Sequence, residues 1–224
     1  SRRIGMVSSK HILRNSEELN RLSERIHVAS RGRRASDPAS LDKHLEACRE
    51  FHERFDSLMY PGGCAVFNRV RQHDPHALET AVTFLLADPI HFRSGYLKEC
   101  LWRWLVHCPL SDLARSRLER AALGYLDRPI KREFAAMCRA MHRIGREAFW
   151  MRVSHALLSV DVLKVRRAEL LLIHKGSLFA GAVARRDMWI RLLKERCGST
   201  TEPSLWLSER RWRYNGRNGT ESST

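Results

Sequence analysis

Apolar side chains return every three or four residues along most of this 224-residue chain, and that spacing restricts its fold more than any other feature. The clearest run would line one face of a helix for about five turns, and it comprises Leu41, Leu45, Cys48, Phe51, Phe55 and Leu58. No segment alternates apolar and polar residues with the β-branched enrichment that is typical of a strand. The sequence therefore predicts an all-α protein.

Capping residues and prolines divide this pattern into helices. The first helix is expected to begin at Ser16, and the second at Ser36 or Asp37, ending before Pro61. An Asp shortly before a proline is a good N-cap for a helix with that proline in its first turn, and such residues are Asp74, Asp88 and Asp127. The later helices are expected at 65–72, 75–87, 90–107, 112–125, 130–143, 147–159, 162–174 and 179–196.

Three segments repeat one pattern, in which an apolar helix is followed by an Asp, four residues, and an Arg. The pairs are Asp88 with Arg93, Asp127 with Arg132, and Asp161 with Arg166, and the Asp positions lie 39 and 34 residues apart. Over roughly residues 74–176 this resembles the HEAT-like helical repeats. The resemblance implies antiparallel helix pairs stacked as an α-solenoid, and an irregular helical bundle is the alternative. We expect each Asp to cap the second helix of its pair and to bind the Arg of a neighbouring repeat.

Positive charge is concentrated at two places in a chain whose formal net charge is +15. Residues 1–35 carry +6, residues 36–111 carry −2, residues 112–196 carry +10 and residues 197–224 carry +1. We therefore expect a basic N-terminal segment with one helix at 1–35, a single all-α helical-repeat domain at 36–196, and a polar, flexible tail at 197–224. Of the 40 cations, 33 are Arg, a side chain suited to bidentate phosphate contacts, although codon bias also enriches Arg.

Motifs for metals, cofactors and membranes are missing from the sequence. His73 and His76 form an H-x-x-H with no second pair of ligands at a recognisable spacing, and no glycine-rich phosphate loop is present. No apolar run approaches the roughly 18 residues of a membrane span. We therefore expect no metal, no cofactor and no membrane partner. Six scattered cysteines without a C-x-x-C pair favour a reduced protein of the cytoplasm, or of the nucleus in a eukaryote.

The candidate binding residues are arginines of the C-terminal half, which could neutralise an anionic partner. They are Arg115, Arg117, Arg120, Arg139, Arg143, Arg146, Arg166, Arg167, Arg185 and Arg186. Arg139, Arg143 and Arg146 are spaced four and three residues apart, so they would line one face of a helix. In the tail, Arg211, Trp212 and Arg213 have the composition of a segment that stacks on bases and pairs with phosphates.

Tryptophans offer a weaker signal for a binding surface. Trp102 and Trp104 are two residues apart in a predicted helix and would point about 200° apart. One of them should therefore face a groove or a neighbouring helix, although ordinary packing explains both.

These observations favour a non-enzymatic binding module, a stack of helix pairs with a basic surface for nucleic acid or an acidic protein. The size, charge and predicted architecture are also similar to the HEAT-like alkylpurine DNA glycosylases, which would imply an enzyme acting on alkylated bases. No catalytic residue of that family can be matched here, so this similarity concerns the fold alone. A protein-interaction scaffold without nucleic acid, or a solvated basic face without a partner, is the remaining alternative.

Overall fold

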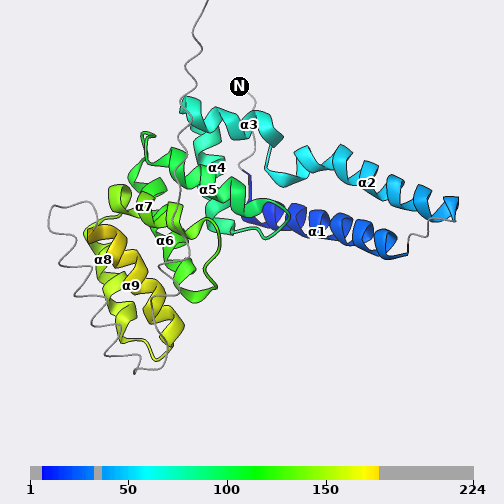
Figure 1. Ribbon diagram of the computed structural model, residues 1–224. Coiled ribbons are helices and arrows are strands. Elements are labelled where there is room, and N and C mark those ends of the chain that lie inside the picture. The colour runs from blue at the N-terminus through cyan, green and yellow to red at the C-terminus, as the bar shows by residue number, and fades with distance from the viewer. Residues whose placement is uncertain (1–6, 33–36, 177–224) are drawn as a thin grey trace, which may run out of the picture. The chain divides into compact units, whose positions relative to one another are not determined.

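The computed structural model describes residues 7–32 and 37–176, and these contain helices and turns but no strand (Figure 1). The all-α prediction is therefore confirmed for the described part of the chain. Its helices are α1 (Ser9–Arg31), α2 (Pro38–Met59), α3 (Gly63–Arg69), α4 (Pro75–Ala87), α5 (Ser94–Leu105), α6 (Asp112–Gly124), α7 (Phe134–Ile144), α8 (Glu147–His155) and α9 (Val162–Gly176). Short 3-10 turns lie at η1 (Val70–Gln72), η2 (Tyr125–Asp127) and η3 (Ala156–Leu158).

The chain divides into two compact units, Ser1–Lys175 and Gly176–Thr224. The predicted helix at 179–196 and the tail at 197–224 lie outside the described residues, as do Arg185, Arg186, Arg211, Trp212 and Arg213.

Helices of the first unit pack in pairs around a shared apolar core. α1 lies along α2 and also contacts α4, while α4 packs on α6 and α5 packs on α7. Helix α4 is largely enclosed, with eight of its thirteen residues buried. The largest core side chains include Trp102, Tyr60 and Tyr125, each at most 1% exposed. This core contains residues from α1 to α9, so the N-terminal helix belongs to the same packed body.

Local capping signals placed the starts of α2 and α4 correctly and the start of α1 incorrectly. Asp37 Oδ1 accepts a hydrogen bond from the N–H of Ala39, and Asp74 Oδ1 accepts one from that of Ala77 at 2.9 Å. These bonds confirm the predicted starts of α2 and α4. The prediction that Ser16 begins the first helix is wrong. Ser8 caps α1, and the buried Ser16 hydroxyl donates to the carbonyl of Ile90.

The predictions that Asp88 and Asp127 cap the next helices are also wrong. Asp88 ends α4 with φ +51°, and α5 begins six residues later at Ser94. Asp127 ends η2, and α7 begins at Phe134. Both carboxylates form long-range ion pairs instead, Asp88 with Arg128 and Asp127 with Lys164 at 2.6 Å.

The third repeated Asp does cap its helix, and the ion pairs of the first two involve bases that were not predicted. Asp161 Oδ1 accepts hydrogen bonds from the N–H groups of Leu163 and Lys164, at 2.8 and 3.3 Å. The predicted bases were Arg93, Arg132 and Arg166. In the structure Arg128 and Lys164 bind the preceding Asp, while Arg132 binds Glu99. The prediction for Arg132 was therefore wrong, because its guanidinium group binds Glu99 and not a repeated Asp.

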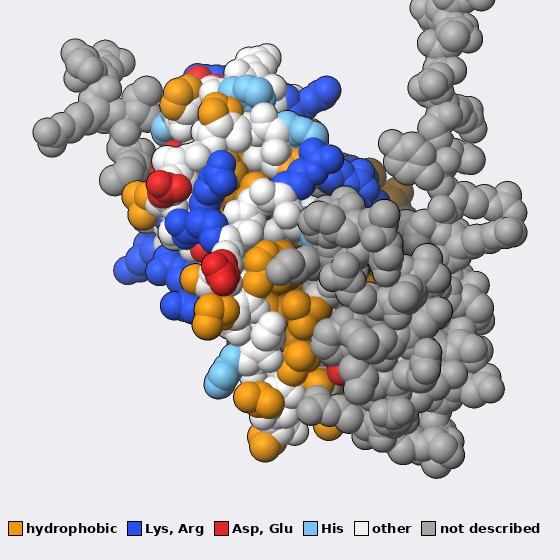
Figure 2. All heavy atoms as spheres, turned by 90° about the vertical axis from the view of Figure 1, so that its left-hand side faces the viewer, with side chains coloured by type: hydrophobic (Ala, Val, Ile, Leu, Met, Phe, Trp, Pro, Cys, Tyr) orange, Lys and Arg blue, Asp and Glu red, His pale blue; other side chains and the backbone are white. Residues whose placement is uncertain are grey.

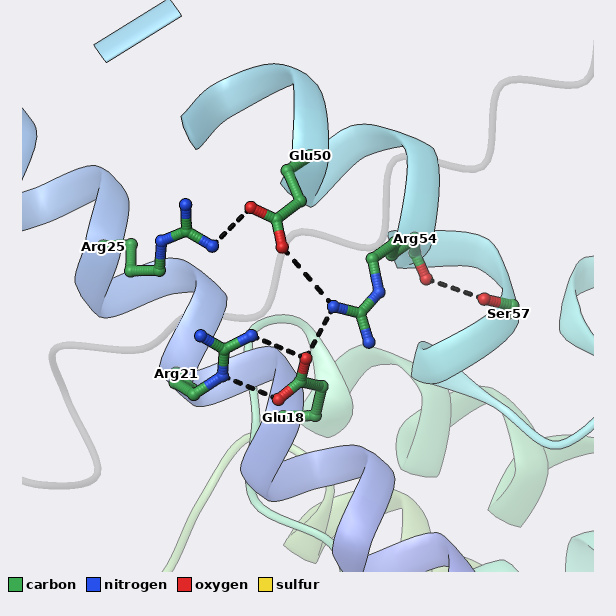
Figure 3. A network of polar contacts seen from close by, with 6 residues as sticks. All are labelled: Glu18, Arg21, Arg25, Glu50, Arg54 and Ser57. Carbon is green, nitrogen blue, oxygen red and sulfur yellow. Dashed lines mark hydrogen bonds and ion pairs between the residues drawn. The ribbon is translucent and has the colours of Figure 1, made fainter. Parts of the chain in front are cut away.

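Five charged side chains join α1 to α2 in one network (Figure 3). Glu18 accepts two hydrogen bonds of 2.8 Å from Arg21 and pairs with Arg54 at 2.6 Å. Glu50 pairs with Arg25 and, at 3.5 Å, with Arg54. The hydrogen bonds from Arg21, together with those from Arg54, lower the pKa of Glu18 from 4.5 to about 2.

Glu18→Gln is expected to remove acid sensitivity from the α1–α2 pair. Because the folded-state pKa is depressed, the carboxylate stabilises the fold above about pH 4.5, and this contribution disappears as the pH falls toward 2. The wild type should therefore be more stable than the variant by about 1 kcal/mol at pH 7 and equal to it near pH 2. Thermal melts across this range measure the difference. Glu17→Gln, at an exposed neighbour, is the control, and parallel pH profiles for wild type and Glu18→Gln would contradict the expectation.

Candidate anion-binding surface

Helix α7 has one buried face and one narrow exposed stripe that is basic. Seven of its eleven residues are buried in the core. The exposed residues on the other side are Arg139 and Arg143, one helical turn apart. Neither side chain forms a hydrogen bond or an ion pair with the described residues. Within the described part of the chain, no acidic group or carbonyl occupies either guanidinium group.

Arg132 extends this stripe beyond the N-terminal end of α7. The N–H of Phe134 bonds to the carbonyl of Lys131, so residues 132 and 133 form a helix-like turn before α7. Arg132 precedes Arg139 by seven residues, which is close to two helical turns, and therefore lies on the same side. We call the set of Arg132, Arg139 and Arg143 the α7 basic surface; Arg132 pairs with Glu99, whereas Arg139 and Arg143 have no ion pair within the described residues. Figure 2 shows the left-hand face of Figure 1, where several Lys and Arg side chains lie at the surface with Asp and Glu side chains among them.

Arg146, predicted to share this face, is occupied by an intramolecular carboxylate. Its Nε and Nη2 lie 3.0 and 2.8 Å from the two carboxylate oxygens of Glu119, and its main-chain N–H donates to Glu119 Oε1 at 2.9 Å. The Arg146 side chain holds the pKa of Glu119 below its usual range. This bidentate contact ties the α7–α8 turn to α6.

Three further candidates also contact the protein itself. Arg117 pairs with Glu79 and donates to Thr83 at 2.8 Å, and the buried Arg167 donates to the Leu126 carbonyl at 2.9 Å. Arg115 Nε lies 3.4 Å from the Leu110 carbonyl. These bonds would have to break before the guanidinium groups could bind an external anion.

The remaining described candidates are exposed and lie on other helices. Arg120 is on α6, where it forms no ion pair or hydrogen bond with residues in the described ranges, and Arg166 is on α9. The structure thus brings together Arg139 and Arg143 on one helix, as the spacing predicted. It does not join the eight described candidates into one surface.

The described tryptophans belong to the packed interior. Trp102 is fully buried, and its Nε1 donates to the hydroxyl of Tyr125 at 3.3 Å. Trp104 is half-buried, with its ring centroid 4.9 Å from that of Phe67 and 5.6 Å from the guanidinium carbon of Arg71. Trp104 thus faces a neighbouring helix, α3, and packs against its core side chain Phe67.

A buried charge cluster that sequence reasoning missed lies between α5 and α7. Lys98 Nζ lies 2.7 Å from Asp88 Oδ1 and 3.1 Å from Glu133 Oε1, and the Lys98 and Glu133 side chains are 2% and 1% exposed. Arg128 also pairs with Asp88, and its guanidinium carbon lies 3.6 Å from the ring centroid of Tyr125. Burial lowers the pKa of Lys98, against the opposing attraction of Glu133. Two cations and two anions balance here around the buried pair of Lys98 and Glu133, so the cluster supports the fold.

Other parts of the described chain lack the features of a metal or membrane site. Within residues 7–32 and 37–176, no three His, Cys, Asp or Glu side chains gather closely enough to hold a metal ion. None of the described helices is both long and apolar enough to cross a membrane. An open groove between α1 and α2 is lined by both signs of charge, including Arg25, Lys43, Glu24 and Glu46, and so does not select anions.

Comparisons with known proteins give no family for this chain. No protein-family model matches it, and searches of curated proteins and of solved structures found no significant match.

Proposed function

We propose that this chain is a non-enzymatic binding module of stacked helix pairs, and that its α7 basic surface binds an anionic partner, either nucleic acid or an acidic protein. The observation that carries this proposal is the outer stripe of α7, where Arg139 and Arg143 face solvent without an acidic partner among the described residues. The packing of α4 on α6 and of α5 on α7 supports the stacking of pairs.

The distribution of acidic side chains also supports the proposal. Residues 112–176 contain 14 Lys and Arg residues and seven Asp and Glu residues. Several of these acids already pair with a specific cation, as Glu119, Asp127 and Glu133 do. The solvent-facing side of this region therefore carries an excess of cations. Lys and Arg that neutralise phosphates give salt-dependent affinity without a catalytic group.

The proposed module would work in a reducing compartment, the cytoplasm or the nucleus. The five described cysteines are all free thiols, which such a compartment would maintain.

Binding assays with three labelled polyanions would test this function. Single-stranded DNA, random duplex DNA and poly-glutamate would be titrated at 50 and 200 mM salt, with fluorescence anisotropy as the readout. We expect micromolar or tighter binding to at least one probe at 50 mM salt, with a steep loss at 200 mM. Failure to bind all three probes at 50 mM salt would overturn the proposal. Release of base from an alkylated duplex would instead indicate a DNA glycosylase.

A further inference from the structure

We propose that the anionic partner is a single-stranded nucleic acid, one base of which stacks on Tyr96 and Arg132 at the N-terminal end of the α7 basic surface. This inference rests on the proposed function, and it specifies the class of partner. Its evidence is an exposed ring and guanidinium pair that adjoins the row of cations.

Tyr96 is the exposed aromatic residue beside that row. It lies in the first turn of α5 and is 54% exposed, whereas Tyr60 and Tyr125 are buried. The guanidinium carbon of Arg132 lies 3.9 Å from the Tyr96 ring centroid, so the charged group covers the ring. The ring therefore has one cation-covered side, and half of the residue is left to solvent.

Glu99 holds Arg132 in this position. The Nε of Arg132 lies 2.5 Å from Glu99 Oε2, and the Glu99 side chain is only 9% exposed. The Arg132 side chain is nevertheless 52% exposed. Because the guanidinium group is held in place, its ordering costs little when a ligand binds. Bases stack on aromatic rings and on Arg guanidinium planes alike, so a base could extend the stack of Tyr96 and Arg132.

The spacing of the row suits a nucleic acid strand. At a helical rise of about 1.5 Å per residue, Arg132 and Arg143 lie about 16 Å apart along α7. A stacked strand with a rise of about 3.4 Å would place about five nucleotides over that length. Phosphates would then face Arg139 and Arg143 while a base lies on the aromatic stack.

An exposed stacking surface favours single strands over the other anionic partners. A duplex keeps its base faces inside its own stack, so only a single strand can present one to Tyr96 without unpairing. An acidic protein could pair with the arginines but would offer no matching planar group as a regular feature. Tyr96 therefore favours a single strand over partners that would bind through charge alone.

Two substitutions at Tyr96 would test this inference. Wild type, Tyr96→Ala and Tyr96→Phe would be titrated at 50 mM salt with a labelled 12-nucleotide single strand and with a strand of equal length made of abasic sites. We expect Tyr96→Ala to bind the base-bearing strand about fivefold or more weakly and the abasic strand as the wild type does. Tyr96→Phe should retain wild-type affinity, because it keeps the ring. Circular dichroism would verify that both variants are folded.

The outcomes separate the stacking inference from the proposed function. Unchanged affinity of Tyr96→Ala for the base-bearing strand, or an equal loss on both strands, would overturn the stacking inference while anion binding stands. Equal affinity of the wild-type protein for the base-bearing and abasic strands would also overturn the stacking inference. Wild-type protein that binds neither strand, nor duplex or poly-glutamate, would overturn the proposed function itself.

Discussion

Replacing Lys98 with Met is expected to lower the free energy of unfolding by about 3–5 kcal/mol. The Lys98 ammonium lies between two carboxylates, 2.7 Å from Asp88 and 3.1 Å from Glu133, and its side chain is 2% exposed. Without it, Arg128 still pairs with Asp88, but the buried Glu133 carboxylate loses its ion pair with Lys98. A charge left buried without a partner is among the costliest changes in a protein interior. Urea unfolding followed by circular dichroism measures the loss.

A double substitution would show that the orphaned charge is the cause. Lys98→Met combined with Glu133→Gln removes both members of the pair, so it should be more stable than the sum of the two single effects predicts. Lys10→Met, at an exposed lysine of α1, is the matched control and should change the free energy of unfolding by less than about 0.5 kcal/mol. If the free energy of unfolding of Lys98→Met lay within about 1 kcal/mol of the wild-type value, the assigned role of the cluster would be contradicted.

Reversing both Arg139 and Arg143 to Glu is expected to weaken polyanion binding on the order of a hundredfold at low salt. Each reversal replaces an attraction of up to about 1 kcal/mol with a repulsion of similar size, and salt screening reduces the sum of these changes to about 3 kcal/mol, which corresponds to that factor. Both side chains are exposed, so the helical content should not change. Anisotropy titration with the anionic probe that the wild type binds best measures the effect.

The matched control carries the same charge change on a different part of the surface. Arg14 on α1 and Arg49 on α2 are exposed and form no ion pair within the described residues, so Arg14→Glu/Arg49→Glu also lowers the net charge by four. Salt screens charges beyond about 10 Å at 0.1 M, so this control should lose less than tenfold in affinity. Equal losses in the two double variants would mean that net charge, and not α7, determines binding.

Arg146 is left out of that variant because of its internal partner. Sequence spacing alone grouped it with Arg139 and Arg143. In the structure its guanidinium binds Glu119, so a Glu at position 146 would face another carboxylate and destabilise the α6–α7 contact. Any loss of binding would then be ambiguous.

Helix starts could be predicted where the signal was local. Asp37 and Asp74 each cap the helix that follows them, within three residues of their own position. Asp88 and Asp127 show the same Asp and proline pattern, yet their carboxylates bind Arg128 and Lys164 from later turns. A tertiary ion pair overrode the local preference there, and one sequence contains no direct record of that contact.

Part of the candidate surface could also be predicted from local spacing, and part could not. The four-residue spacing of Arg139 and Arg143 predicted that they share a helix face, and the structure places both on the exposed side of α7. Arg117 and Arg146 instead form ion pairs with Glu79 and Glu119 on neighbouring helices. The sequence analysis considered only the positions of the cations and so could not predict these pairs. The exposure of Tyr96 was missed because its helix is rich in apolar residues, so periodicity alone could not distinguish this ring from the core ones.

The most direct test of the α7 basic surface is the salt dependence of binding in wild type and in Arg139→Glu/Arg143→Glu. For a single strand, the logarithm of the binding constant falls with the logarithm of salt concentration by about 0.7 for each phosphate neutralised. If these two arginines each contact a phosphate, the slope should become shallower by about 1.4 in the variant and stay at the wild-type value in Arg14→Glu/Arg49→Glu. Identical slopes for all three proteins would contradict binding at α7.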